Sequence, residues 1–231
     1  MRTEDLRKLG WMTILFVAMA FLESAVVVYL RALYYPDGFE LTLVPMDPGL
    51  VRTEVWREVA TMVMLLAPGA LVARSALERF AWFCFGFGVW DIFYYIWLKV
   101  LLDWPASLAT PDLLFLIPVP WIGPVWAPCL ISIGLIILAF LLLRHVAQRP
   151  DVPLGVGVWS SLVGGACLMI ISFLIVPLSQ AFGLHEMMHG AGSSSAHGPL
   201  LTAYPWGWLL AGMILATSGL LRVYRSGRMT R

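Results

Sequence analysis

Three of the four histidines lie within one short polar segment between two apolar runs. His185, Glu186 and His189 form the sequence H-E-M-M-H. On a helix, residues four apart share a face, so two such imidazoles can bind one metal ion while the glutamate between them acts as general base on a metal-bound water. His197 follows a Gly/Ser-rich stretch and is a candidate third ligand. The predicted metal is zinc, or copper, because two methionines separate the histidines.

The same residues carry two partial resemblances. H-E-M-M-H is similar to the HExxH motif of zinc metalloproteases, which implies a catalytic role for Glu186. His185 and His189, taken with Asp91, resemble part of the zinc site of alkaline ceramidases, which are seven-helix membrane amidases. This resemblance implies Asp91 as a further ligand and an apolar substrate. The alternative interpretation of the segment is a solvated connector that happens to contain histidines.

A second group of candidates consists of carboxylates inside apolar runs. Asp91 lies in the middle of an aromatic-rich run, residues 79–104, and Tyr94 and Tyr95 are candidate hydrogen-bond partners one turn later. A charged side chain in hydrocarbon costs about 2.5–3.5 kcal/mol on insertion scales, so we expect these acids to face a bundle interior and to have partners. The charged residues that could form one network are Glu23, Arg31, Glu54, Arg57, Glu58, Asp91 and Lys99.

Three interpretations of this network remain open: an ion-pair network that braces the helices, metal ligation, and a proton relay. Glu54 and Glu58 are one helical turn apart, a spacing that is repulsive unless a cation or a shared proton lies between them.

The composition indicates the elements that must position these residues. The 231-residue chain is 60% hydrophobic and 13% charged, whereas soluble domains are about 45–50% apolar and about 25% charged. We therefore predict one all-α, six-span membrane domain. Its helices are expected at about residues 11–33, 53–73, 80–102, 125–143, 154–182 and 204–224.

Two connecting segments differ from ordinary turns. Residues 103–124 are apolar but rich in proline, which excludes a regular helix. Lipid does not tolerate exposed irregular backbone, so this segment should lie at the membrane interface or fold back against protein. Residues 183–203 form the loop that carries the histidines.

The distribution of Lys and Arg predicts the orientation. Eleven of the 15 fall on the side of the two termini and four on the other. Because cytoplasmic loops carry the excess of Lys and Arg, we predict cytoplasmic termini in a bacterial inner membrane, with the histidine loop on the periplasmic side. The net charge of +1 gives no reason to expect a nucleic-acid partner.

Three classes of function fit the sequence. The first is a metal-binding membrane protein, and within that class a metalloenzyme acting on an apolar substrate. The second is a non-catalytic subunit of a larger membrane complex, for example a respiratory one, or a homo-oligomer, since the chain is small and carries glycine-rich helix faces. The third is a proton-coupled transporter, favoured by the intramembrane acids, although the sequence shows no internal repeat.

Overall fold

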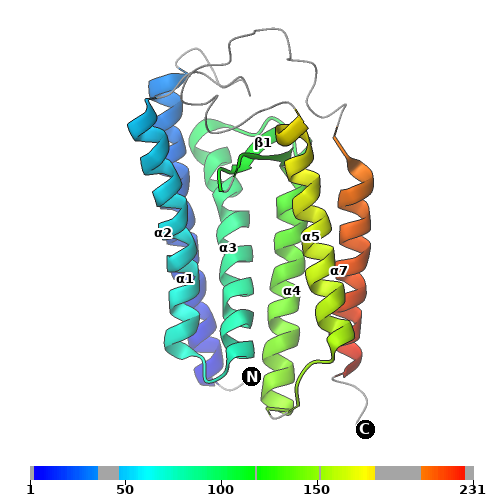
Figure 1. The fold of residues 1–231 in the computed structure, drawn as a ribbon. Helices are drawn as coiled ribbons and strands as arrows, with labels where there is room; N and C mark the ends of the chain where they lie inside the picture. The colour runs from blue at the N-terminus through cyan, green and yellow to red at the C-terminus, as the bar shows by residue number, and fades with distance from the viewer. Residues whose placement is uncertain (1–2, 36–46, 118, 151, 180–203, 227–231) are drawn as a thin grey trace.

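The computed structural model describes residues 3–35, 47–117, 119–150, 152–179 and 204–226, which are mostly helical. Six helices in these ranges are long and apolar enough to cross a membrane. They stand side by side and alternate in direction, so that the start of the first helix and the end of the last lie at the end of the bundle opposite a small hairpin (Figure 1). The helices are α1 (Thr3–Tyr34), α2 (Pro48–Val72), α3 (Ala76–Leu102), α4 (Trp126–Gln148), α5 (Val156–Ser179) and α7 (Trp206–Ser226).

Helix α3 is the centre of the first part of the bundle, where it packs against α1, α2 and α4. It approaches α4 closely at Gly88, where a Cβ atom would lie 2.6 Å from the carbonyl oxygen of Ser132. A larger residue at this position would push the two backbones apart. The missing side chain therefore sets the spacing of α3 and α4 one turn before Asp91.

Helices α5 and α7 pack mainly against each other. Their contact is built on Gly165 and Gly212, because a Cβ atom on either glycine would lie 2.8 Å from the carbonyl oxygen of the other. Helix α7 joins this pair to α4. The bundle thus consists of α1 to α4 grouped around α3, with the α5–α7 pair alongside.

Local signals mark several helix ends. The carboxylate of Asp47 accepts hydrogen bonds from the backbone N–H groups of Gly49 and Leu50 at the start of α2, and the Ser75 hydroxyl accepts one from Glu78 at the start of α3. Such side chains satisfy amides that have no partner within the helix. Asp103 ends α3 in the left-handed conformation, with φ 50°.

The proline-rich connection between α3 and α4 contains a two-stranded antiparallel hairpin, which the all-α prediction did not include. Strand β1 (Pro111–Phe115) pairs with β2 (Trp121–Pro124), and Leu113 lies opposite Ile122. The prolines at 111 and 124 pair with each other at the open end of the ladder, where a missing N–H group costs least. The hairpin contacts α4 and α5 through β2.

A membrane-embedded candidate binding cavity

A cavity of about 940 Å³ lies beneath the hairpin, and every one of the six helices contributes to its lining. Most of the lining side chains are aliphatic or aromatic. Leu130, Val163 and Cys167 line it and are also exposed on the surface of the bundle, so the cavity has an apolar opening there. Its volume is within the range of small-molecule sites, about 300–1,000 Å³.

Aromatic rings form a continuous group along the upper part of the cavity. We call this group the aromatic cluster, and its members are Phe87, Trp90, Tyr94, Phe115, Trp121 and Phe173. Phe115 of β1 stacks on Phe87 of α3 at 6.2 Å between ring centroids, and Trp121 of β2 stacks on Phe173 of α5 at 6.3 Å. The hairpin therefore joins rings from the two sides of the cavity into one wall.

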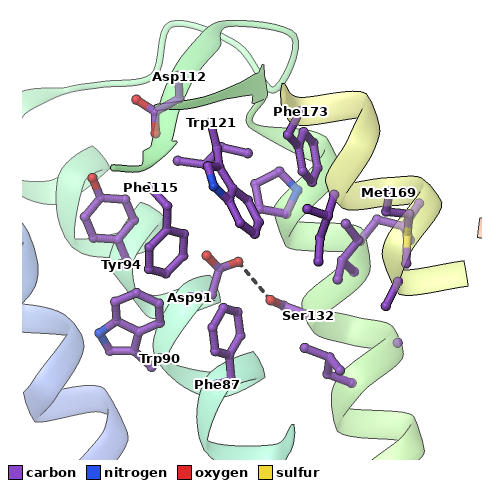
Figure 2. A pocket seen from close by; sticks show the side chains of 18 of the residues that line it. Phe87, Trp90, Asp91, Tyr94, Asp112, Phe115, Trp121, Ser132, Met169 and Phe173 are labelled. Atoms are coloured by element: carbon purple, nitrogen blue, oxygen red, sulfur yellow. Dashed lines mark hydrogen bonds between the residues drawn. The ribbon is translucent and has the colours of Figure 1, made fainter. Parts of the chain in front are cut away.

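Asp91 is the carboxyl group at the centre of this wall (Figure 2). It is 7% exposed, and one oxygen, Oδ2, accepts a hydrogen bond of 2.8 Å from the buried hydroxyl of Ser132 on α4. Within the described ranges this is its only side-chain hydrogen bond, and no salt bridge there reaches it. The second oxygen therefore keeps its capacity to accept a hydrogen bond or face a cation. The prediction that Tyr95 binds Asp91 is wrong, because its hydroxyl donates to Asp112 instead.

Three buried indole groups, those of Trp82, Trp90 and Trp121, also lack hydrogen-bond partners in the part of the chain that the structure describes. The Nε1–H donors of Trp90 and Trp121 are inaccessible to solvent and make no hydrogen bond there, and both residues line the cavity. Buried donors without a partner are rare in folded proteins.

The hairpin is held in place by two carboxylates. Both oxygens of Glu58 on α2 lie 3.0 Å from the backbone nitrogen of Leu116, just after β1, and accept its hydrogen. Asp112 of β1 accepts a hydrogen bond of 2.9 Å from the hydroxyl of Tyr95 on α3. The two contacts fix the two ends of β1 to the helices α3 and α2.

Asp112 lies outside the candidate spans and is 3% exposed. Burial raises its pKa from the ordinary value of 3.8 to about 6, because the charged form loses its hydration. The Tyr95 hydroxyl, the guanidinium of Arg31 and the Leu113 amide favour the charged form and lower the pKa by a smaller amount. Asp112 thus changes charge close to neutral pH.

The predicted charged network separates into distinct groups. Arg57 forms ion pairs with Glu23 on α1 and with Glu54, whose Oε2 accepts a hydrogen bond of 2.9 Å from Nε of Arg57. Thr61 donates a further bond of 3.1 Å to Glu23. Arg57 therefore supplies the cation expected beside Glu54, whose spacing to Glu58 is otherwise repulsive. The Glu58 carboxylate binds the hairpin instead. This network joins α1 to α2 at the edge of the cavity.

The two remaining basic residues lie near the end of α3. The guanidinium carbon of Arg31 is 4.2 Å from the centroid of the Trp104 ring, a cation–π distance. Lys99 pairs with Asp103 at 2.7 Å on an exposed surface, outside the cavity lining. The ion pairs of the described residues do not connect Arg31, Asp91 or Lys99 to the Glu23–Arg57–Glu54 group.

The predicted metal ligands are not brought together within the described residues. His185, Glu186, His189 and His197 lie outside them, so the zinc or copper site stays a prediction. In the described part of the chain, no group of three or more His, Cys, Asp or Glu side chains could hold a metal ion. Asp91, predicted as a metal ligand or relay, is bound to Ser132.

Sequence reasoning missed several residues of the site. Ser132 is a lone hydroxyl in an apolar run, and Asp112 is a lone acid between prolines, which are signals of the same kind that singled out Asp91. Phe115, Trp121 and Phe173 gave no signal, because aromatic residues are common in membrane helices and near their ends.

Comparison with protein-family models, curated proteins and solved structures finds no match to this chain.

Proposed function

We propose that this protein binds a mostly apolar small molecule from the membrane in the cavity beneath the hairpin, with a polar group of that molecule placed at Asp91. The observation that carries the proposal is a buried carboxyl group at the centre of an aromatic wall, with one oxygen that accepts no hydrogen bond from the described residues. An intramembrane carboxylate is costly and commonly marks a functional site.

The opening of the cavity supports access from the lipid. Its exposed rim residues Leu130, Val163 and Cys167 carry no charge and belong to helices that are candidate spans. A molecule dissolved in the bilayer can reach such an opening without crossing water. This route favours an apolar ligand, in keeping with the apolar substrate expected for a membrane metalloenzyme with ligands His185 and His189.

We also propose that the hairpin faces the outer side of the membrane and that the termini are cytoplasmic. Arg74, Arg79, Arg144 and Arg149 lie in or beside the α2–α3 and α4–α5 turns, at the end of the bundle opposite the hairpin. An excess of basic residues in short loops favours the cytoplasmic side. The candidate site would then lie in the outer half of the bilayer.

A variant that fills the cavity tests the binding proposal. Ala166 on α5 lines the cavity, so Ala166→Trp should exclude a ligand, whereas Ile171→Trp changes an exposed position of the same helix that is not part of the lining. Proteins in nanodiscs are extracted with organic solvent, and the extracts are compared by mass spectrometry. We expect one molecule class enriched with wild type and Ile171→Trp and lost in Ala166→Trp. Equal extracts from all three would overturn the proposal.

A further inference from the structure

The charges that line the cavity are strongly unequal. Its described lining includes five carboxyl groups but only two guanidinium groups, and no lysine or histidine. The carboxyl groups belong to Glu23, Glu54, Glu58, Asp91 and Asp112, and the guanidinium groups to Arg31 and Arg57. An anionic molecule, such as a fatty acid or a phospholipid headgroup, would meet net repulsion here.

The basic groups are already engaged at the edge of the cavity. Arg57 pairs with Glu23 and Glu54, and Arg31 lies over the Trp104 ring. Asp91 has no basic partner among the described residues and accepts only the Ser132 hydroxyl. Three of the lining carboxyl groups, those of Glu58, Asp91 and Asp112, thus have no ion pair among the described residues, and of these Asp91 lies at the centre of the aromatic wall.

Aromatic faces around a carboxylate favour one chemical class of ligand. Ring faces carry negative electrostatic potential and attract organic cations, including quaternary ammonium groups. Phe87, Phe115 and Trp121 surround Asp91 in Figure 2, so a cation at this point would meet ring faces and a carboxylate together. A neutral molecule bearing only hydrogen-bond acceptors would leave Asp91 unmatched.

We infer that the ligand is a lipophilic organic cation, an amine or quaternary ammonium group carrying apolar substituents, held by Asp91 and the aromatic cluster. The apolar substituents contact the aliphatic and aromatic side chains that line the rest of the cavity, among them Phe80, Phe83 and Leu162. This inference rests on the proposed function and adds the charge of the ligand. The charge of Asp91 and the faces of the aromatic rings then favour a cationic group, while the apolar remainder of the cavity favours apolar substituents on it.

Two probes of nearly the same shape and opposite charge test the inference. Tetraphenylphosphonium is a lipophilic cation and tetraphenylborate is its anionic counterpart. Binding of each to wild type in zwitterionic nanodiscs is measured by equilibrium dialysis against empty nanodiscs, and by the shift in Tm. We expect saturable binding and a raised Tm with the cation only.

Variants connect this binding to the site. Asp91→Asn removes the charge but keeps an oxygen for the Ser132 hydroxyl, and we expect it to weaken cation binding at least ~10-fold. Trp121→Leu removes a ring and should weaken it several-fold, which provides a second measurement if Asp91→Asn folds poorly. The control Asp103→Asn removes an exposed carboxylate outside the cavity and should bind as wild type does.

The outcomes separate this inference from the proposed function. Equal affinity for the two probes, or unchanged cation binding in both Asp91→Asn and Trp121→Leu, would overturn the cation inference. If the extraction experiment yields a neutral molecule that Ala166→Trp excludes, the binding function stands and the cation inference fails. If Ala166→Trp and wild type give equal extracts and bind the cation equally, both fail.

Discussion

Asp112 is buried in the hairpin, and its only side-chain hydrogen bond in the described ranges comes from Tyr95. Its neighbour in the cavity, Asp91, has the same type of arrangement with Ser132. In both cases one hydroxyl from another element binds one buried carboxyl group. Asp112 also accepts a hydrogen bond from the Leu113 amide. These contacts position the acids but leave each with unused acceptor capacity, which distinguishes them from the ion-paired Glu23.

The raised pKa of Asp112 makes a prediction about stability and pH. Because this pKa is about 6 in the fold against 3.8 ordinarily, the folded state binds the proton more tightly than the unfolded state. The stabilising contribution of the proton is present below about pH 4 and is lost as pH rises through 6. The difference is on the order of 3 kcal/mol. We expect Asp112→Asn to flatten the fall in Tm between pH 4 and 7, because asparagine does not ionise. Its carbonyl oxygen can still accept the Tyr95 hydroxyl, so the fold is kept.

The control for this measurement is Asp103→Asn. Asp103 is exposed and paired with Lys99, which lowers its pKa by hydrogen bonding and charge attraction, so it remains ionised over this range. This variant should follow the wild-type Tm curve from pH 4 to 7. A wild-type slope that persists in Asp112→Asn would show that other groups cause it.

At the scale of elements, the hairpin carries the contacts that shape the site. Its rings Phe115 and Trp121 join the aromatic residues of α3 to Phe173 of α5, and its backbone amide at Leu116 is held by Glu58 of α2. A two-stranded hairpin is marginally stable by itself. We infer that the helices, rather than the short ladder, keep it in place.

Replacement of Glu58 tests this dependence. Glu58→Ala leaves the Leu116 amide without its acceptor, which costs about 1–3 kcal/mol for a buried group. We expect faster amide hydrogen exchange across residues 111–124 and unchanged exchange in α7. Glu58→Gln keeps a carbonyl oxygen for this amide and should restore slow exchange. Equal protection in wild type and Glu58→Ala would show that the hairpin is held by other contacts.

At the scale of the whole molecule, the sequence was sufficient for the six helices but not for the cavity. Long apolar runs predict spans because a membrane helix satisfies its own backbone hydrogen bonds. The order of packing around α3, the pairing of α5 with α7 and the strands 111–115 and 121–124 depend on contacts between distant segments. Asp91 could be singled out as a lone acid, whereas its partner Ser132 required the α3–α4 spacing that Gly88 sets.

The orientation can be checked with cysteines introduced at the two ends of the bundle. Asp103 and Gln148 are both exposed and lie at opposite ends of the fold, beyond α3 and at the end of α4. With a membrane-impermeant thiol reagent on intact cells, we expect labelling of Asp103→Cys and none of Gln148→Cys until the membrane is permeabilised. The reverse pattern would place the hairpin in the cytoplasm. The unaltered chain, with Cys84, Cys129 and Cys167 inside spans, is the background control.

The hydrogen bond between Asp91 and Ser132 has a consequence for biosynthesis. The ribosome completes α3, the hairpin and α4 before it makes α5 and α7. During insertion, the side of the cavity that α5 and α7 supply is therefore still missing. Through that interval the aspartate would meet lipid. Because its hydroxyl partner lies on the next helix in the chain, the acid has a hydrogen bond as soon as α4 enters the membrane. The order of synthesis thus protects the residue that the final structure keeps at the centre of its cavity.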